Sequence, residues 1–280
     1  MKSAIYPVLY VIVSAITTVV IDGLVTNLPV TLVLFLVTSI AILYFHLLNY
    51  RKLDVVYRSF LKTPGLVVLV NIALAVTWAA TYFGIAYLNA TIYNIIYFSI
   101  TAVLATLMGQ KRNFIQASLL IVTLAVGVFV MKLSLTGALI GVLAGIAGFS
   151  YRKWSFALSQ KASLSSSQVL TIRFWILWLV LLCVAPLKIV PAMTVHLWLL
   201  VLLTAFTSFI LQNWLNQQGI QKAGVKRSTL ILSWTPTVTL ACQIIVLHQF
   251  HWSWLILALV CQVLLFLNTI HEGLTKWIRK

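Results

Sequence analysis

The stretch from Leu135 to Gln160 reads LTGALIGVLAGIAGFSYRKWSFALSQ and falls at the middle of the 280-residue chain. Glycines recur in it every four residues, at positions 137, 141 and 145. On a helix this spacing places the glycines on one face, where a second helix can approach closely because no Cβ intervenes. The same helix then carries two cations between two aromatics, Tyr151-Arg152-Lys153-Trp154. We therefore expect a close helix–helix joint here, between two halves of the chain.

The composition is that of a membrane protein. Hydrophobic residues make up 62% of the chain and charged residues only 8%, whereas soluble domains carry roughly 25% charged residues. A formal net charge of +16 can indicate nucleic-acid binding. In a chain this apolar, basic residues instead gather in cytoplasmic loops, where they contact lipid headgroups. We therefore expect membrane lipids, and no nucleic acid, among the partners.

Ten apolar runs of about 20 residues can be marked, which is the length that spans a bilayer as a helix. They are residues 5–25, 29–48, 65–86, 91–108, 114–131, 135–156, 169–186, 195–217, 228–247 and 252–270. The sequence thus predicts an all-α integral membrane protein with ten transmembrane helices.

The distribution of positive charge agrees with an even number of spans. With the N-terminus in the cytoplasm, all of the 19 lysines and arginines except Lys132 and Lys188 fall on the cytoplasmic side. Cytoplasmic loops of membrane proteins carry such an excess. We therefore predict a multi-pass protein of the cytoplasmic (inner) membrane with both termini inside.

Ten spans divide into two five-helix repeats, residues 1–132 and 133–280. An odd number of spans per repeat gives the two repeats opposite orientation, and transporters built this way bind substrate near the midplane between the repeats. The halves also echo each other, since the third run joins the fourth, and the eighth joins the ninth, with almost no loop. These joins are residues 82–90 and 217–224.

The joins resemble those of the drug/metabolite transporter superfamily, specifically its EamA-type ten-helix transporters. Trp234-Thr235-Pro236 matches the family's mid-helix proline in the second half, and Arg173-Phe174 matches a common pair early in the seventh helix. The chain departs from the family pattern at Gln110 and Gln249, where glutamates are usual, and at Tyr97, which stands in place of the first-half proline.

The resemblance covers the whole chain and implies a basket of two five-helix halves. Helices one, three, four, six, eight and nine would surround a central cavity, and helices five and ten would pack at the periphery. Solutes would cross by alternating access.

Polar and aromatic side chains on the central helices are candidates for this cavity, because polar groups in a bilayer are costly unless they face protein or water. The candidates for substrate binding are Asn71, Trp78, Thr81, Tyr82, Tyr93, Asn94, Tyr97, Arg152, Trp154, Asn213, Asn216 and Trp234. Pro236 is a candidate hinge, because a proline lacks the N–H that would bond the carbonyl one turn earlier. For four of these residues an alternative to substrate binding stays open. Trp78 and Trp234 would instead belong to the aromatic belts at the membrane interfaces. Asn71 and Asn213 would instead only form hydrogen bonds between helices.

Two interpretations also stay open for Arg152 and Arg173. Arg152 lies ~16 residues, or ~24 Å, into its helix, about a turn short of the inner boundary of a ~30 Å core. Its guanidinium could snorkel to the cytoplasmic headgroups. Alternatively, it stands at the cytoplasmic mouth and attracts an anionic group of the substrate. Arg173 has the same two interpretations.

The chain contains three acids, Asp22, Asp54 and Glu272, and none lies in the middle of an apolar run. Proton-coupled export of lipophilic cations needs a membrane-embedded carboxylate, so this activity is disfavoured. The sequence also lacks a GxxxxGK nucleotide-binding loop, and no catalytic or metal cluster is visible. We therefore expect neither an enzyme nor a bound cofactor.

Three functions remain in order of preference. The first is a secondary transporter of a small polar or amphipathic metabolite, preferably amino-acid-like. The second is an importer or exchanger of an anionic or nucleotide-like cofactor. The third is a lipid flippase or a membrane enzyme. The oligomeric state is expected to be a monomer or a homodimer.

Overall fold

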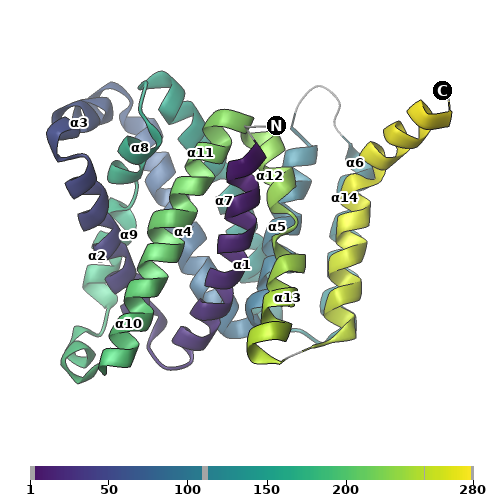
Figure 1. Cartoon of the computed structure of the whole chain (residues 1–280), viewed down its shortest axis with the longest axis horizontal. Helices are drawn as coiled ribbons and strands as arrows, with labels where there is room; N and C mark the ends of the chain where they lie inside the picture. The colour runs from purple at the N-terminus through teal and green to yellow at the C-terminus, as the bar shows by residue number, and fades with distance from the viewer. Residues whose placement is uncertain (1–3, 109–112, 249, 279–280) are drawn as a thin grey trace.

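The protein is all-helical. The computed structural model describes residues 4–108, 113–248 and 250–278, and for residue 247 and residues 267–278 it describes the backbone alone. Helices account for 88% of the described residues, which include no strand. The helices stand side by side along one direction, and the start of α1 and the end of α14 lie at the same end of the bundle (Figure 1). The all-α prediction is therefore confirmed.

The helices follow one another in chain order with short connections. They are α1 (Ile5–Val25), α2 (Val30–Leu48), η2 (Tyr50–Lys52), α3 (Leu53–Lys62), α4 (Pro64–Leu88), α5 (Ala90–Thr106), α6 (Phe114–Val130), α7 (Leu135–Lys161), α8 (Ser166–Ile172), α9 (Trp175–Val184), η3 (Leu187–Ala192), α10 (Val195–Thr204), η4 (Ala205–Gln212), α11 (Asn213–Ala223), α12 (Val225–Leu232), α13 (Thr235–Leu247) and α14 (Trp252–Ile278).

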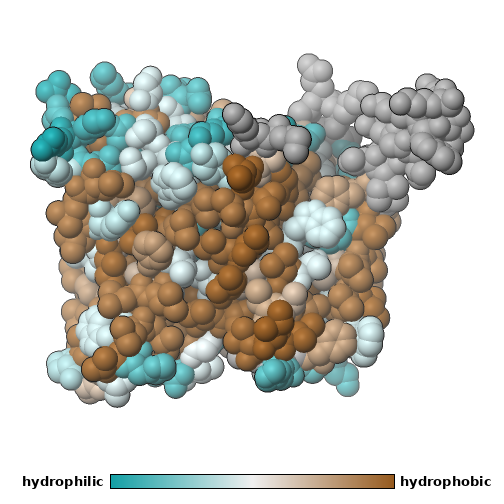
Figure 2. Space-filling view, in the orientation of Figure 1, coloured by the Kyte–Doolittle hydropathy of each residue, from teal (hydrophilic) through white to brown (hydrophobic). Residues whose placement is uncertain are grey.

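The described residues contain seven helical segments long and apolar enough to cross a membrane. These are Ile5–Val25, Val30–Leu48, Pro64–Leu88, Leu135–Lys161, Ser166–Val184, Val195–Ala223 and Val225–Val246. Three shorter apolar helices accompany them: Ala90–Thr106, Phe114–Val130 and Trp252–Phe266. On the face seen in Figure 2, a broad apolar band crosses the middle of the molecule and polar residues gather at its two ends. The chain is therefore a multi-pass membrane protein.

Three of the ten apolar runs depart from a regular α-helix in ways that the hydropathy pattern does not show: two are broken and one contains a π-helix. The seventh run is split between α8 and α9 at Arg173 and Phe174. The eighth is one continuous helical segment in which η4 forms a π-helix, a feature that frequently marks functional sites. The ninth is split between α12 and α13 at Ser233 and Trp234.

The glycine face of α7 packs against α5 and the end of α4. A Cβ at Gly145 would stand 2.7 Å from the side chain of Ile100, so α5 lies against the backbone of α7. The face extends beyond the expected ladder to Gly148, where a Cβ would stand 2.4 Å from the hydroxyl of Tyr97. Only glycine leaves room for this tyrosine. The close joint expected from the sequence is therefore present, and its partner is α5.

The two short joins have the same backbone conformation. Asn89, between α4 and α5, has φ 91° and ψ 167°. Gly224, between α11 and α12, has φ 80° and ψ 160°. Residues other than glycine rarely adopt this region. Asn89 is held there as the N-cap of α5, since its side-chain oxygen accepts a hydrogen bond of 3.0 Å from the backbone N–H of Ile92.

Candidate functional site

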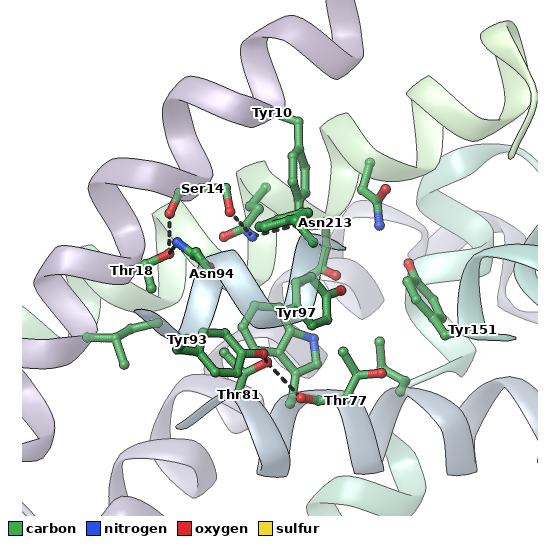
Figure 3. A pocket seen from close by; sticks show the side chains of 16 residues that line it. Tyr10, Ser14, Thr18, Thr77, Thr81, Tyr93, Asn94, Tyr97, Tyr151 and Asn213 are labelled. Atoms are coloured by element: carbon green, nitrogen blue, oxygen red, sulfur yellow. Dashed lines mark hydrogen bonds between the residues drawn. The ribbon is translucent and has the colours of Figure 1, made fainter. Parts of the chain in front are cut away.

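A polar cavity lies among α1, α4, α5, α7, η4 and α11 (Figure 3). Its volume is about 40 Å³, which holds water, whereas metabolite sites measure roughly 300–1,000 Å³. The cavity must therefore widen before it can hold a metabolite. Its lining residues are Tyr10, Ser14, Thr18, Ile21, Leu74, Thr77, Trp78, Thr81, Tyr93, Asn94, Tyr97, Phe98, Tyr151, Gln212, Asn213 and Asn216.

Most of the candidate substrate-binding residues are brought together here. Those that line the cavity are Trp78, Thr81, Tyr93, Asn94, Tyr97, Asn213 and Asn216. The sequence analysis missed the contribution of α1. Tyr10, Ser14 and Thr18 recur every four residues, which places them on one helical face, and this polar stripe was visible in the sequence. Tyr151 was also not predicted as a cavity residue, whereas Gln212, beside Asn213 in the eighth apolar run, was a polar candidate and does line the cavity.

The end of the cavity nearest the start of α5 is closed by hydrogen bonds between helices. The hydroxyls of Thr81 and Tyr93 lie 2.6 Å apart. Asn94 donates to the hydroxyls of Thr239 on α13, at 2.8 Å, and Thr18 on α1, at 3.3 Å. These bonds hold α1, α4, α5 and α13 together on this side of the cavity.

Asn71 does not line the cavity, and its side chain has a structural role. It donates to the carbonyl of Ile172 at 2.8 Å and accepts from the backbone N–H of Ile176 at 3.4 Å. These two backbone groups would bond each other in an unbroken helix. The Asn71 amide therefore replaces a helical hydrogen bond at the break between α8 and α9. This supports the interhelical interpretation of Asn71. Substrate binding by Asn71 stays a prediction.

Three further candidates also lie off the cavity lining. Tyr82 is fully buried and packs against Phe209, with ring centroids 6.5 Å apart. Trp154 is partly buried against the hydrophobic core. Trp234 lies at the break between α12 and α13, is 45% exposed and packs against Phe266 of α14. These three residues are therefore not part of the cavity lining, and substrate binding by them stays a prediction.

Pro236 lies in the first turn of α13, directly after the break. The carbonyl that the proline leaves free, at Leu232, accepts a hydrogen bond of 2.7 Å from the hydroxyl of Thr235. The freed acceptor is therefore satisfied locally and is not offered to a substrate. A hinge motion at this break stays a prediction.

Arg152 is fully buried and does not snorkel. Its Nη2 donates to the Tyr97 hydroxyl at 3.2 Å, and its guanidinium carbon lies 5.8 Å from the centre of the Tyr97 ring. Nε and Nη1 have no hydrogen-bond partner among the described residues. Consecutive residues on a helix point about 100° apart, so Arg152 turns inward while its neighbour Lys153 is exposed.

Arg173 is also fully buried, at the break between α8 and α9. Its Nη1 donates to the hydroxyl of Tyr151, and its Nη2 donates to the side-chain oxygen of Asn213 at 2.6 Å. Asn213 in turn donates to the carbonyl of Ser208 at 2.9 Å, five residues earlier in the π-helix. The helix break, the guanidinium and the π-helix therefore form one connected unit beside the cavity.

Neither arginine has a carboxylate partner in the part of the chain that the structure describes. The ion pair found there joins Arg58 and Asp54 at the exposed end of the bundle. Asp22 accepts a hydrogen bond of 3.1 Å from the backbone N–H of Ala90, at the start of α5. Two positive charges are thus buried near a polar cavity without a protein counter-charge, which is a costly arrangement in a membrane protein.

The residues described hold no group of three or more His, Cys, Asp or Glu side chains that could bind a metal ion. The family positions Gln110 and Gln249 lie outside the described residues.

No protein-family model and no curated protein matches the chain. A crystal structure of another protein is similar over 96% of this chain and 98% of its own length, with a TM-score of 0.63 and 12% sequence identity. At this identity the similarity concerns the fold alone. Fold and cavity together define a multi-pass, all-helical membrane protein with a polar interior.

Proposed function

We propose that this protein is a secondary transporter that moves a small polar or amphipathic metabolite, preferably amino-acid-like, across the cytoplasmic membrane by alternating access. The observation that carries the proposal is the position of the polar cavity inside an apolar-belted bundle of helices (Figures 2 and 3). Polar residues gathered at such a site in a membrane protein mark substrate pathways.

The proposal includes ten spans arranged as two inverted five-helix repeats, residues 1–132 and 133–280. Each of the ten apolar runs coincides with a helix or an interrupted helix. The matching backbone at Asn89 and Gly224 lies at corresponding places in the two repeats. The cavity receives side chains from α1, α4 and α5 of the first repeat and from α7, η4 and α11 of the second. These features are those of a transporter that binds substrate between its repeats.

The orientation follows from charge. Helix ends carrying Lys62, Lys161 and Lys222 lie at the end of the bundle that holds the start of α1 and the end of α14. Positive charge marks the cytoplasmic side, so this end faces the cytoplasm in the proposal. The opposite end contains the α5 start and Asp22.

Alternating access requires the cavity to open to each side in turn. Towards the cytoplasmic end, Lys222 of α11 donates to the Tyr6 hydroxyl of α1 at 2.8 Å. At the opposite end, Thr91 of α5 donates to Gln243 of α13. Both ends are thus held by side-chain contacts between the proposed repeats. Breaking either set would open a route to the cavity.

Uptake by proteoliposomes tests the proposal. The purified protein is reconstituted and assayed against labelled amino acids, organic acids, nucleotides and neutral metabolites, with headgroup-labelled lipid as a separate arm. We expect saturable uptake of one solute class, with a higher half-saturation concentration in Asn94→Ala. The exposed-face substitution Val122→Ala serves as the control and should not change uptake. Lipid movement without solute uptake would instead identify a flippase.

A further inference from the structure

The phenolic hydroxyls of Tyr97 and Tyr151 share one property that sets them apart in the cavity. Each accepts a hydrogen bond from a buried guanidinium, Tyr97 from Arg152 and Tyr151 from Arg173. A guanidinium can only donate, because it carries N–H groups and no acceptor. Each phenolic oxygen therefore acts as the acceptor in this bond, and its own proton is left for another partner.

The Tyr97 hydroxyl makes no other side-chain hydrogen bond among the described residues. The Tyr151 hydroxyl also bonds the side chain of Asn216, whose Oδ1 has no partner, so the Asn216 amide nitrogen donates and the phenolic oxygen is the acceptor in both bonds. Both tyrosines line the cavity, and Figure 3 shows them reaching it from two helices, Tyr97 from α5 and Tyr151 from α7. Two O–H donors therefore converge on the cavity. Each is polarised by the cation behind it, which strengthens it as a donor.

The charges beside the cavity, like the hydroxyl donors, favour an anion. Both arginines are fully buried, and two guanidinium nitrogens of Arg152, Nε and Nη1, have no hydrogen-bond partner among the described residues. Charges in a low-dielectric interior interact strongly, so the two guanidiniums make this side of the cavity attractive to an anion. An anion bound there would supply the counter-charge that the protein itself does not provide.

We propose that the cavity binds an oxyanion group of its substrate, a carboxylate or a phosphate, through the hydroxyls of Tyr97 and Tyr151, which Arg152 and Arg173 hold in place. This inference rests on the proposed transport function and names the chemical class of its substrate. The tyrosines contact the oxyanion. The arginines act as positioning residues that fix the direction of each O–H and supply the positive field.

The rest of the lining indicates what the oxyanion is attached to. Trp78, Leu74 and Phe98 also line the cavity. Trp78 is packed against Phe209, with ring centroids 4.3 Å apart, which fixes the indole in place. An apolar or aromatic body fits this wall. The substrate class is therefore a small amphipathic oxyanion.

Binding to the purified full-length protein tests the proposal without a transport assay. Phenylacetate, phenyl phosphate and the neutral isostere phenylacetamide are titrated by calorimetry and by shifts in melting temperature. We expect phenylacetate or phenyl phosphate to bind at least tenfold more tightly than phenylacetamide, and the preferred probe distinguishes a carboxylate substrate from a phosphate. Equal binding of phenylacetate and phenylacetamide, or no binding of either anion, would overturn the proposal.

Variants assign the binding to the two hydroxyls. Tyr97→Phe and Tyr151→Phe should each weaken binding of the preferred anion about tenfold or more. Tyr82→Phe, which removes a buried hydroxyl away from the cavity lining, should leave it unchanged. Wild-type anion affinity in both cavity variants would contradict the assignment. Because the comparison of the probes uses the wild-type protein, the test holds even if a variant does not fold.

The failure of this proposal is distinguishable from failure of the transport function. Uptake of neutral solutes with no anion binding would support the transport function and refute the oxyanion site. Anion binding that is weakened by Tyr97→Phe and Tyr151→Phe, with no uptake of any solute, would support the oxyanion site and refute the transport function.

Discussion

Replacing Gly148 by alanine should disconnect Tyr97 from Arg152. The added Cβ would lie 2.4 Å from the Tyr97 hydroxyl, whereas ordinary van der Waals contact between such atoms begins at about 3.4 Å. The hydroxyl must therefore move by about 1 Å. A shift of that size lengthens the hydrogen bond to Arg152, now 3.2 Å, beyond the range in which such bonds hold.

The magnitude follows from the kind of bond that is lost. Hydrogen bonds to charged groups contribute about 1.5–3 kcal/mol, and each ~1.4 kcal/mol is a factor of ten in affinity. We therefore expect Gly148→Ala to weaken binding of the preferred anionic probe by roughly 10- to 100-fold. The melting temperature should also fall, since the Arg152 guanidinium would lose the hydrogen bond it makes to Tyr97.

Calorimetric titration of Gly148→Ala and Gly145→Ala side by side separates loss of the Tyr97–Arg152 hydrogen bond from general damage to helix packing. A Cβ at Gly145 would meet Ile100 at 2.7 Å and the Tyr97 carbonyl at 3.0 Å, so the α5–α7 packing is disturbed without reaching the hydroxyl. Both variants should melt at lower temperature, and only Gly148→Ala should lose anion affinity. The same affinity loss in both variants would refute the reasoning, because it would reflect general damage to packing.

Three further predictions address the fold and the motion. Asn71→Ala should lower the free energy of unfolding by about 1–3 kcal/mol, because backbone groups at the α8–α9 break lose their partner; thermal melts check this, and an unchanged midpoint contradicts it. Gly224→Ala should cost about 1–2 kcal/mol because its φ of 80° strains any Cβ, whereas the control Gly65→Ala, in a helix with open space around it, should not destabilise. A disulfide between cysteines introduced at Thr91 and Gln243, whose side chains bond each other, should stop uptake by proteoliposomes until a reductant is added. Undiminished uptake by the cross-linked protein would show that this end need not open.

Hydropathy was sufficient to predict the helical class and the positions of the long apolar helices, because apolar length decides both in a membrane. The short polar helix α3 was not predicted, because it lies in the connection between two apolar runs. The breaks were not predictable in the same way. The interruption at Arg173 depends on Asn71, about 100 residues earlier in the chain, whose amide takes over the bonds that the break leaves open. The hydropathy of the seventh run does not indicate a partner so distant in the chain.

The candidate site was predicted only in part, because the sequence reveals polar residues within helices but not the direction in which long side chains point. Polar residues in mid-helix, such as Asn94 and Asn216, marked the cavity walls, since few other positions tolerate them. The direction of a long side chain depends on the rotation of its helix. That rotation turns Arg152 inward and leaves Trp234 on the outside. The four-residue stripe on α1 was the one readable signal that the sequence analysis did not use.

Uptake of amphipathic oxyanions by proteoliposomes tests the central claim most directly. Labelled phenylacetate, phenyl phosphate and a panel of amino acids are offered to vesicles carrying wild-type protein, Tyr97→Phe or no protein. We predict saturable uptake of at least one oxyanion by the wild type, strongly reduced in Tyr97→Phe. Uptake no greater than that of protein-free vesicles for every solute would contradict the account.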